Sequence, residues 1–312
     1  MSDREPNDGI TRRDFVATGA AAGTLLATGV GFGEQSQWPA PDLVVAHGPD
    51  VAKNTAAVIE AHGGIGAFVR PGQIVNILPN AQGSHPGTST DPVLVKTVVD
   101  LCKKAGAKEV RWLTWQSGKY FERSNIAQLV KGSGAKFIQV DSDDESQWNN
   151  FEVPSGVALE NIRVFKIIDE CDVFINLPII KDHIGSRFTG SLKNYMGASH
   201  PTDNRLFHPT FEGEDLLRME QCIADLNTVV RKPDLIIADA MTILTSKGPF
   251  GPGDIAKPNK VIAGVDRVAL DSYGATLLGL EGSEVTMILN AHQLGLGEID
   301  LRKVKIQEME VG

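Results

Sequence analysis

The segment Asp172–Ile180, with the sequence DVFINLPII, limits the possible folds more than any other part of the chain. It is almost continuously apolar and has the length of one strand, which is the pattern of a strand buried on both faces. A second run of this kind covers Asp234–Ala240. Segments with helical periodicity lie between such runs, for example 92–105, where apolar residues recur at spacings of three and four. This alternation predicts an α/β fold with a mainly parallel sheet and helices on both faces.

The remaining elements are predicted from apolar periodicity and from turn residues. Asp91 is expected to be an N-cap with Pro92 in the first helical turn, and Asp266 is expected to cap another helix. The acidic segment 141–150 is predicted to be a surface loop, and 181–197 a loop that ends in a helix start. Strands are expected at 43–47, 73–78, 109–115, 135–140, 172–180, 234–240 and 260–264, and helices at 55–62, 92–105, 125–132, 216–230 and 266–278.

The first residues have the features of an export signal. Arg12 and Arg13 are followed by Asp14 and Phe15, and the next segment, 16–32, carries no charge and is rich in Ala and Gly. That segment is too short and too rich in glycine for a good membrane-spanning helix. The pattern resembles a twin-arginine signal peptide. We therefore expect residues 1–35 to be a leader recognised by the twin-arginine translocase, either cleaved or kept as an anchor, and residues 36–312 to be an α/β domain that works in the periplasm or outside the cell.

Charge and cysteine content narrow the function classes. The formal net charge of −9 argues against non-specific nucleic-acid binding, which needs a basic surface. The three cysteines, Cys102, Cys171 and Cys222, lie far apart in the sequence, so this chain alone is not expected to ligate an iron–sulfur cluster. Their helical contexts favour free thiols over a disulfide.

The segment after the 172–180 strand carries the strongest functional signal. It gathers Lys181, His183, Thr189, Lys193 and Asn194 between glycines, directly after a buried strand of an acidic protein. Ligands in open α/β sheets bind beyond the carboxyl ends of the strands. Ammonium, hydroxyl and amide groups together can hold a phosphate or carboxylate. We therefore predict an anion site there, with His183 as the proton-transfer group. A solvated basic loop is the structural alternative.

Two further strand ends supply candidates. The loop 79–92 contains Asn80 and Thr90 and leads into a capped helix, so both residues are predicted to bind the ligand. Asp239 ends a buried strand and is the candidate carboxylate partner of His183. Asp271 follows Arg267 by four residues, and a buried ion pair between them is one expectation.

The histidines of the chain suggest a metal site as an alternative hypothesis. His85, His183 or His208, together with Asp239, would provide ligands for a metal-dependent hydrolase, and His200 is a further histidine near this set. None of these residues has the HExxH spacing of the zinc proteases. Whether a metal or another cofactor is bound is not predicted by the sequence.

Several motifs occur in order along the chain, including Asn176-Leu-Pro178 followed by Lys181, and then Thr189-Gly190 followed by Lys193-Asn194. Together they resemble the bacterial and archaeal family known as domain of unknown function 362. The resemblance covers about residues 70–280. Some members are fused to ferredoxin-like iron–sulfur modules, which implies a redox role. The expected function is an exported protein, and by this resemblance an enzyme with a redox role, that binds a small anionic ligand or cofactor. The alternatives are a non-catalytic periplasmic binding protein and the metal-dependent hydrolase.

Overall fold

A computed structural model describes residues 41–114, 134–208 and 214–312. These residues belong to one compact unit, Trp38–Gly312. The predicted leader 1–35 and the helix predicted at 125–132 lie outside the described residues. Within the described ranges, no helix is both long and apolar enough to cross a membrane.

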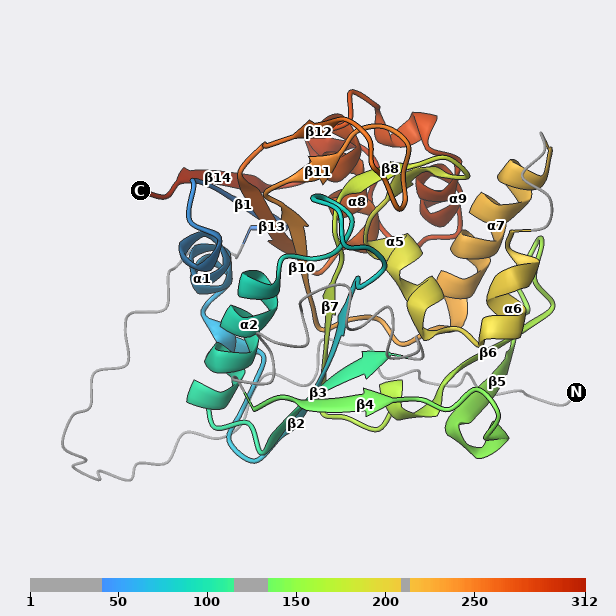
Figure 1. Ribbon diagram of the computed structural model, residues 1–312, viewed down its shortest axis with the longest axis horizontal. Helices are drawn as coiled ribbons and strands as arrows, with labels where there is room; N and C mark the ends of the chain where they lie inside the picture. Colours follow the sequence, from blue (N-terminus) through green and yellow to red (C-terminus); the bar gives the residue numbers. More distant parts are fainter. Residues whose placement is uncertain (1–40, 115–133, 209–213) are drawn as a thin grey trace, which may run out of the picture. The chain divides into compact units, whose positions relative to one another are not determined.

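The centre of the fold is an eight-stranded sheet with the order β14-β1-β13-β10-β7-β2-β3-β4 (Figure 1). All neighbouring strands are parallel except the two pairs that contain β13. The predicted α/β class with a mainly parallel sheet is therefore confirmed. The strands are β1 (Leu43–His47), β2 (Ile74–Pro79), β3 (Glu109–Thr114), β4 (Lys136–Gln139), β7 (Val173–Leu177), β10 (Leu235–Ala240), β13 (Lys260–Gly264) and β14 (Ile306–Glu310).

Helices cover both faces of this sheet, as predicted. Along β1, Leu43 and Val45 belong to one hydrophobic cluster, while Val44 and Ala46 belong to the other, because successive strand residues point to opposite faces. Helices α1 and α2 lie on one side in Figure 1, and α5, α7, α8 and α9 on the other. The helices are α1 (Val51–Ala61), α2 (Pro92–Lys104), α5 (Ser191–Asn194), α6 (Pro201–Leu206), α7 (Glu214–Val229), α8 (Arg267–Thr276) and α9 (Thr286–Gln293).

The predicted caps of two helices are confirmed. The Asp91 carboxylate accepts a hydrogen bond from the Val93 N–H, and Pro92 occupies the first turn of α2. The Asp266 carboxylate accepts from two N–H groups at the start of α8. The cysteine prediction also holds, since all three thiols are free, with Cys102 and Cys222 buried.

Short hairpins replace two segments that were predicted to be loops. Segment 141–150 contains the 3₁₀ turn Glu145–Gln147 and the start of β5 (Trp148–Glu152), which pairs with β6 (Asn161–Phe165). The acidic composition hid this strand, which the buried Trp148 ring fixes against Phe165. Segment 181–197 forms the hairpin β8 (Lys181–His183) and β9 (Arg187–Thr189) before α5. A third hairpin pairs β11 (Ile243–Leu244) with β12 (Ile255–Ala256). The remaining 3₁₀ turns are Ile65–Ala67, Lys166–Ile168, Tyr195–Ala198, Gly282–Glu284 and Leu301–Lys303.

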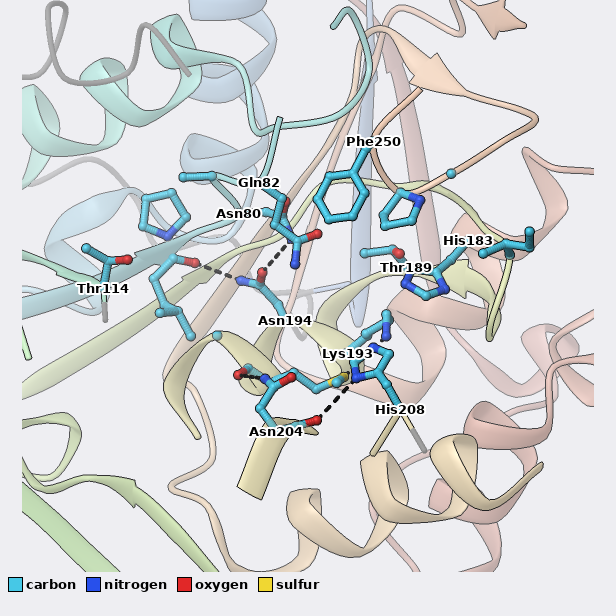
Figure 2. A pocket seen from close by; sticks show the side chains of 18 of the residues that line it. Asn80, Gln82, Thr114, His183, Thr189, Lys193, Asn194, Asn204, His208 and Phe250 are labelled. Carbon is cyan, nitrogen blue, oxygen red and sulfur yellow. Dashed lines mark hydrogen bonds between the residues drawn. The ribbon is translucent and has the colours of Figure 1, made fainter. Parts of the chain in front are cut away.

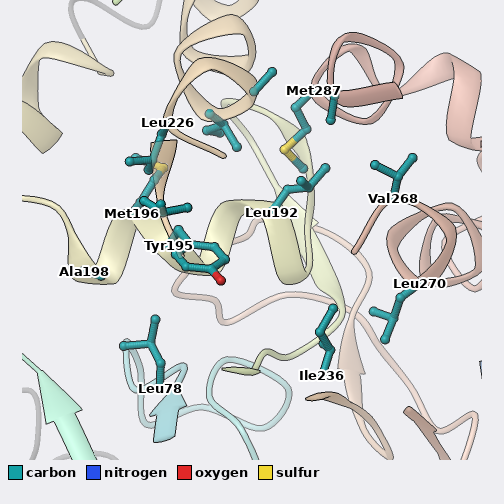
Figure 3. Packing of buried hydrophobic residues seen from close by; sticks show 14 of the residues in the cluster. Leu78, Leu192, Tyr195, Met196, Ala198, Leu226, Ile236, Val268, Leu270 and Met287 are labelled. Carbon is teal, nitrogen blue, oxygen red and sulfur yellow. The ribbon is translucent and has the colours of Figure 1, made fainter. Parts of the chain in front are cut away.

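Helix α5 is short but packs in the middle of the core on its side of the sheet (Figure 3). Leu192 and Tyr195 are fully buried, and the Tyr195 hydroxyl donates to the Arg231 carbonyl at 2.7 Å. Because its apolar residues face the core, the polar residues of the same turns are fixed in position. This packing holds Lys193 and Asn194 rigidly.

Candidate functional site

A cavity of about 820 Å³ lies where β2 and β3 end. Its walls come from the segment after β2, the end of β3, the hairpin β8–β9, helices α5 and α6, and the loop 247–251 (Figure 2). This is the carboxyl end of the parallel strands, where ligands of open α/β sheets bind. The cavity therefore lies at the place that the sequence predicted.

Five of the eight predicted site residues line this cavity. They are His183, Thr189, Lys193, Asn194 and Asn80. The structure thus brings together side chains from two separate segments of the chain, the loop 79–92 and the segment 181–197. The other three, Lys181, Thr90 and Asp239, are buried outside the lining.

The start of α5 is fixed by a buried carboxylate. Asp271 of α8 accepts hydrogen bonds from the N–H groups of Ser191 and Leu192, at 2.6 and 2.9 Å. A Cβ atom on Gly190 would overlap the same carboxylate, so glycine is required at this position. Burial raises the pKa of Asp271 to about 7, and the two N–H groups oppose that rise. The predicted ion pair is wrong: the Arg267 guanidinium donates instead to the side chain and the carbonyl of Asn227.

Lys193 is the most deeply buried of the lysine and arginine residues that line the cavity. Its side chain is 6% exposed, and its Nζ atom contacts the thioether sulfurs of Met196 and Met219, at 3.2 and 3.9 Å. Thioethers are weak acceptors and do not neutralise an ammonium group. Burial lowers the pKa of Lys193 to about 7, while the Glu220 carboxyl acts in the opposite direction. Lys193 therefore lacks the acceptor that a buried ammonium needs.

Two more polar groups surround Lys193. Burial lowers the pKa of His183, and the neighbouring Lys193 lowers it further, so its ring is neutral at pH 7. Its Nδ1 atom accepts from the Gly185 N–H at 2.9 Å, which places its proton on Nε2. The Thr189 hydroxyl is buried without a hydrogen-bond partner. Figure 2 shows Thr189 beside the His183 ring.

His208 completes the cluster. Its ring centroid lies 6.4 Å from that of His183, and its Nδ1 atom contacts the Asn204 carbonyl at 3.2 Å. Burial lowers the pKa of His208, and Lys193 lowers it further. The sequence motifs indicate only a metal-ligand role for this histidine, because the 25 residues that separate it from His183 hide their proximity.

The amide groups of three asparagines connect the walls. Asn194 donates to the Leu78 carbonyl at 2.8 Å and to the Asn176 side chain at 2.7 Å, and it accepts from Asn80 at 3.2 Å. These bonds occupy both ends of the Asn194 amide. Asn80 and Asn194 therefore hold the wall in shape as well as line it.

Lys181 lies behind the wall. Its Nζ atom lies within hydrogen-bonding distance of four oxygens, from Asn80, Gln82, Thr88 and Pro249, at 2.7 to 3.4 Å. It therefore links the segment after β2 to the loop 247–251. Burial lowers the pKa of Lys181 to about 7, and Lys193 lowers it further.

Thr90 and Asp239 have structural partners. The Thr90 hydroxyl donates to the Leu177 carbonyl and accepts from the Asn80 N–H. The Asp239 carboxylate accepts from the N–H groups of Asp91 and Met241, at 2.7 and 2.9 Å. Neither residue lines the cavity, and the Asp239 carboxylate makes no hydrogen bond to His183. Asp239 therefore joins β10 to the start of α2, and Thr90 joins β7 to the segment after β2.

The histidines do not assemble with Asp239. His200 caps α6 and contacts the Ser142 carbonyl, and His85 is absent from the cavity lining. Across 41–114, 134–208 and 214–312, no group of three or more His, Cys, Asp or Glu side chains could hold a metal ion.

Other lining residues were missed by the sequence analysis. Gln82 belongs to the loop 79–92 but is not among its predicted site residues, while Asn204, Arg205, Lys247 and Phe250 belong to segments that have no recognisable motif. Among the described lining residues, the charged ones are Lys193, Arg205 and Lys247, and none is Asp or Glu. The cavity is thus cationic in a protein of net charge −9.

Sheet, helices and cavity together define an α/β protein with a cationic cavity at the carboxyl ends of its parallel strands. More specifically, the chain belongs to the DUF362 family, described as a domain of unknown function. The family model matches residues 75–276, more than half of the chain. The resemblance drawn from the sequence motifs is thereby confirmed.

One curated relative and two solved structures are also similar. The chain is 26% identical over 245 residues to the thylakoid-associated protein sll1697 of Synechocystis sp., covering 77% of this chain and 73% of the relative. A structure from Thermotoga maritima has a TM-score of 0.41 at 11% identity, covering 62% of this chain and 51% of that one. The lactate racemase apoprotein from Thermoanaerobacterium thermosaccharolyticum has a TM-score of 0.43 at 15% identity, covering 71% and 54%. The chain spans about half the length of these two solved chains.

Proposed function

We propose that this protein binds a small anionic ligand, a carboxylate or phosphate compound, in the cavity beside Lys193. The observation that carries the proposal is the composition of the lining: three basic side chains and no carboxylate among its described residues. Walls of low dielectric strengthen the field of such a cavity and raise the local concentration of anions.

The inner end of the cavity offers groups that an anion would satisfy. The Lys193 ammonium contacts only thioether sulfurs, and the Thr189 hydroxyl has no partner. Both groups are more than nine-tenths buried, so water does not replace the missing acceptor freely. An anionic oxygen between them would accept from both and would favour the charged form of Lys193.

The proposal includes catalysis, with His183 as the proton-transfer group. A neutral imidazole in a cavity wall can donate or accept a proton at the bound ligand. A redox role stays part of the proposal because of the iron–sulfur modules fused to some family members. A non-catalytic binding protein is the alternative. An enzyme should lose rate with both His183→Ala and Lys193→Ala, whereas a binding protein should lose affinity mainly with Lys193→Ala.

Thermal unfolding with added phosphate, acetate or an organic cation tests the ligand class. A ligand at one hundred times its Kd stabilises the folded protein by about 2.7 kcal/mol. We expect an anion to raise the Tm of the wild type and of Lys303→Met, an exposed control on another part of the surface. Lys193→Met should abolish the rise. An equal rise in Lys193→Met would refute the proposed site.

We also propose export by the twin-arginine route. The support is Arg12-Arg13 followed by an uncharged segment, which lies outside the described residues. Fusing residues 1–35 to a reporter that is active only after folded export would test it. Replacement of both arginines by lysine should retain the reporter in the cytoplasm, and unchanged export would contradict this part of the proposal.

A further inference from the structure

The two buried lysines of the site have opposite surroundings. Lys181 is fully buried behind the cavity wall, where four oxygens surround its Nζ atom. Lys193 lines the cavity, and its Nζ atom contacts only two thioether sulfurs. Lys181 is therefore tied to the framework, whereas the amine of Lys193 is accessible to a molecule in the cavity.

The charged and titratable neighbours of Lys193 come from three elements. Glu220 faces it from α7, Lys181 and His183 from β8, and His208 from the residues after α6. Burial raises the pKa of Glu220, which weakens the one carboxylate that would hold the Lys193 proton. With its own pKa lowered to about 7 by burial, Lys193 exists in part as the free amine at neutral pH.

We propose that Lys193 is a nucleophile that forms an imine with a small aldehyde or ketone bound in the cavity. The proposal goes beyond anion binding and does not depend on it. It rests on the position of the amine in the cavity wall, on its lack of an oxygen partner, and on the polar side chains beside it.

The reaction balances without another reagent. The Lys193 Nζ lone pair attacks the carbonyl carbon, a C–N bond forms, and the carbonyl oxygen takes up a proton to give a carbinolamine. That intermediate loses its hydroxyl group as water, and the two hydrogens of this water balance the two that the amine loses. The products are the imine and one water molecule. Nothing is oxidised or reduced.

Two neighbours can assist these steps. The Thr189 hydroxyl has no partner in the folded protein and can donate to the carbonyl oxygen. His183 carries its proton on Nε2, because Nδ1 accepts from Gly185, and can move a proton to the departing oxygen. Lys181 is fully buried and does not line the cavity, so it serves as an internal control within the same protein.

Limiting propanal with cyanoborohydride tests the proposal on the wild-type protein near neutral pH. Cyanoborohydride reduces the imine to a stable propyl amine, and peptide mass spectrometry locates it. Because an amine with a pKa of about 7 is far less protonated than an exposed lysine, we expect about tenfold or more excess label on Lys193 over Lys303. Lys181 should stay unlabelled, and unfolding in urea should remove the preference. Label on Lys193 no greater than on Lys303, or label on Lys181 equal to that on Lys193, would overturn the proposal.

A repeat with inorganic phosphate at constant ionic strength separates the two proposals. A bound phosphate would protonate Lys193 and reduce its label without changing that of Lys303. Label that phosphate does not reduce, with no phosphate binding by calorimetry, would support the nucleophile and refute the anion site. Phosphate binding by calorimetry without preferential label would support the anion site and refute the nucleophile.

Discussion

The Nζ atom of Lys193 lies 3.2 Å from the thioether sulfur of Met196, three residues further along the chain. A lysine in this position is costly when charged, because a thioether does not replace the water that burial removes. The same feature that lowers the stability of the unliganded protein leaves a basic group whose charged form an anionic ligand would stabilise. Stability and binding at this site should therefore respond in opposite directions to substitution.

The pH dependence of stability should report Lys193 directly. Its folded pKa of about 7 lies below the ordinary 10.5, so between these values the unfolded chain holds the proton that the folded chain has lost. The free energy of unfolding then rises with pH over that window, by up to about 1.4 kcal/mol per pH unit for one lysine. Urea unfolding should show a smaller slope for Lys193→Met, since the contribution of Lys193 is then removed. Parallel profiles for Lys193→Met and wild type would contradict the assignment.

Substitution of two threonines should distinguish a residue that binds the ligand from one that stabilises the fold. In Thr189→Val, a buried hydroxyl without a partner is replaced by a methyl group, so stability should change little or increase. The affinity for phosphate should nevertheless fall several-fold. In Thr90→Val, two hydrogen bonds are lost, and unfolding should become easier by roughly 1–3 kcal/mol. Equal losses of stability in the two variants would show that the Thr189 hydroxyl has a partner.

The glycines at the two ends of the α5 region should differ sharply in how much an alanine substitution lowers the stability of the protein. A Cβ atom on Gly190 would meet the Asp271 carboxylate and the Phe188 ring, whereas nothing lies within 4 Å of one on Gly197. We expect Gly190→Ala to destabilise the protein by roughly 1–3 kcal/mol, because both obstacles are buried. Gly197→Ala should have nearly wild-type stability. Chemical unfolding of both variants checks this, and a tolerated Gly190→Ala would contradict the described capping of α5.

Much of the fold could be predicted because it depends on local sequence. The apolar run of β7 and the Asp91-Pro92 start of α2 each specify one element without help from the rest of the chain. The hairpin β8–β9 could not be predicted in this way. Its strands have three residues each, and their pairing depends on packing against distant segments.

The location of the candidate site could be predicted in part for a similar reason. Residues that follow parallel strands or precede a helix start, such as Lys193, meet at one edge of the sheet by topology alone. Asp239 also ends a strand, but its carboxylate accepts hydrogen bonds from the N–H groups of Asp91 and Met241. The contact with Asp91 depends on tertiary packing, which a local sequence pattern does not reveal. His208 and the loop 247–251 reach the cavity from segments without periodicity, so no local pattern marks them.

Proton uptake on anion binding is the measurement that tests the central claim most directly. At about pH 8 the free Lys193 is largely neutral, and a bound phosphate should favour its ammonium form. Isothermal titration in buffers of different ionisation enthalpy should therefore show uptake of up to about one proton per phosphate bound by the wild type. Lys193→Met should bind weakly and take up none, while Lys303→Met should match the wild type. Phosphate binding without proton uptake, or with the same uptake in Lys193→Met, would contradict the account.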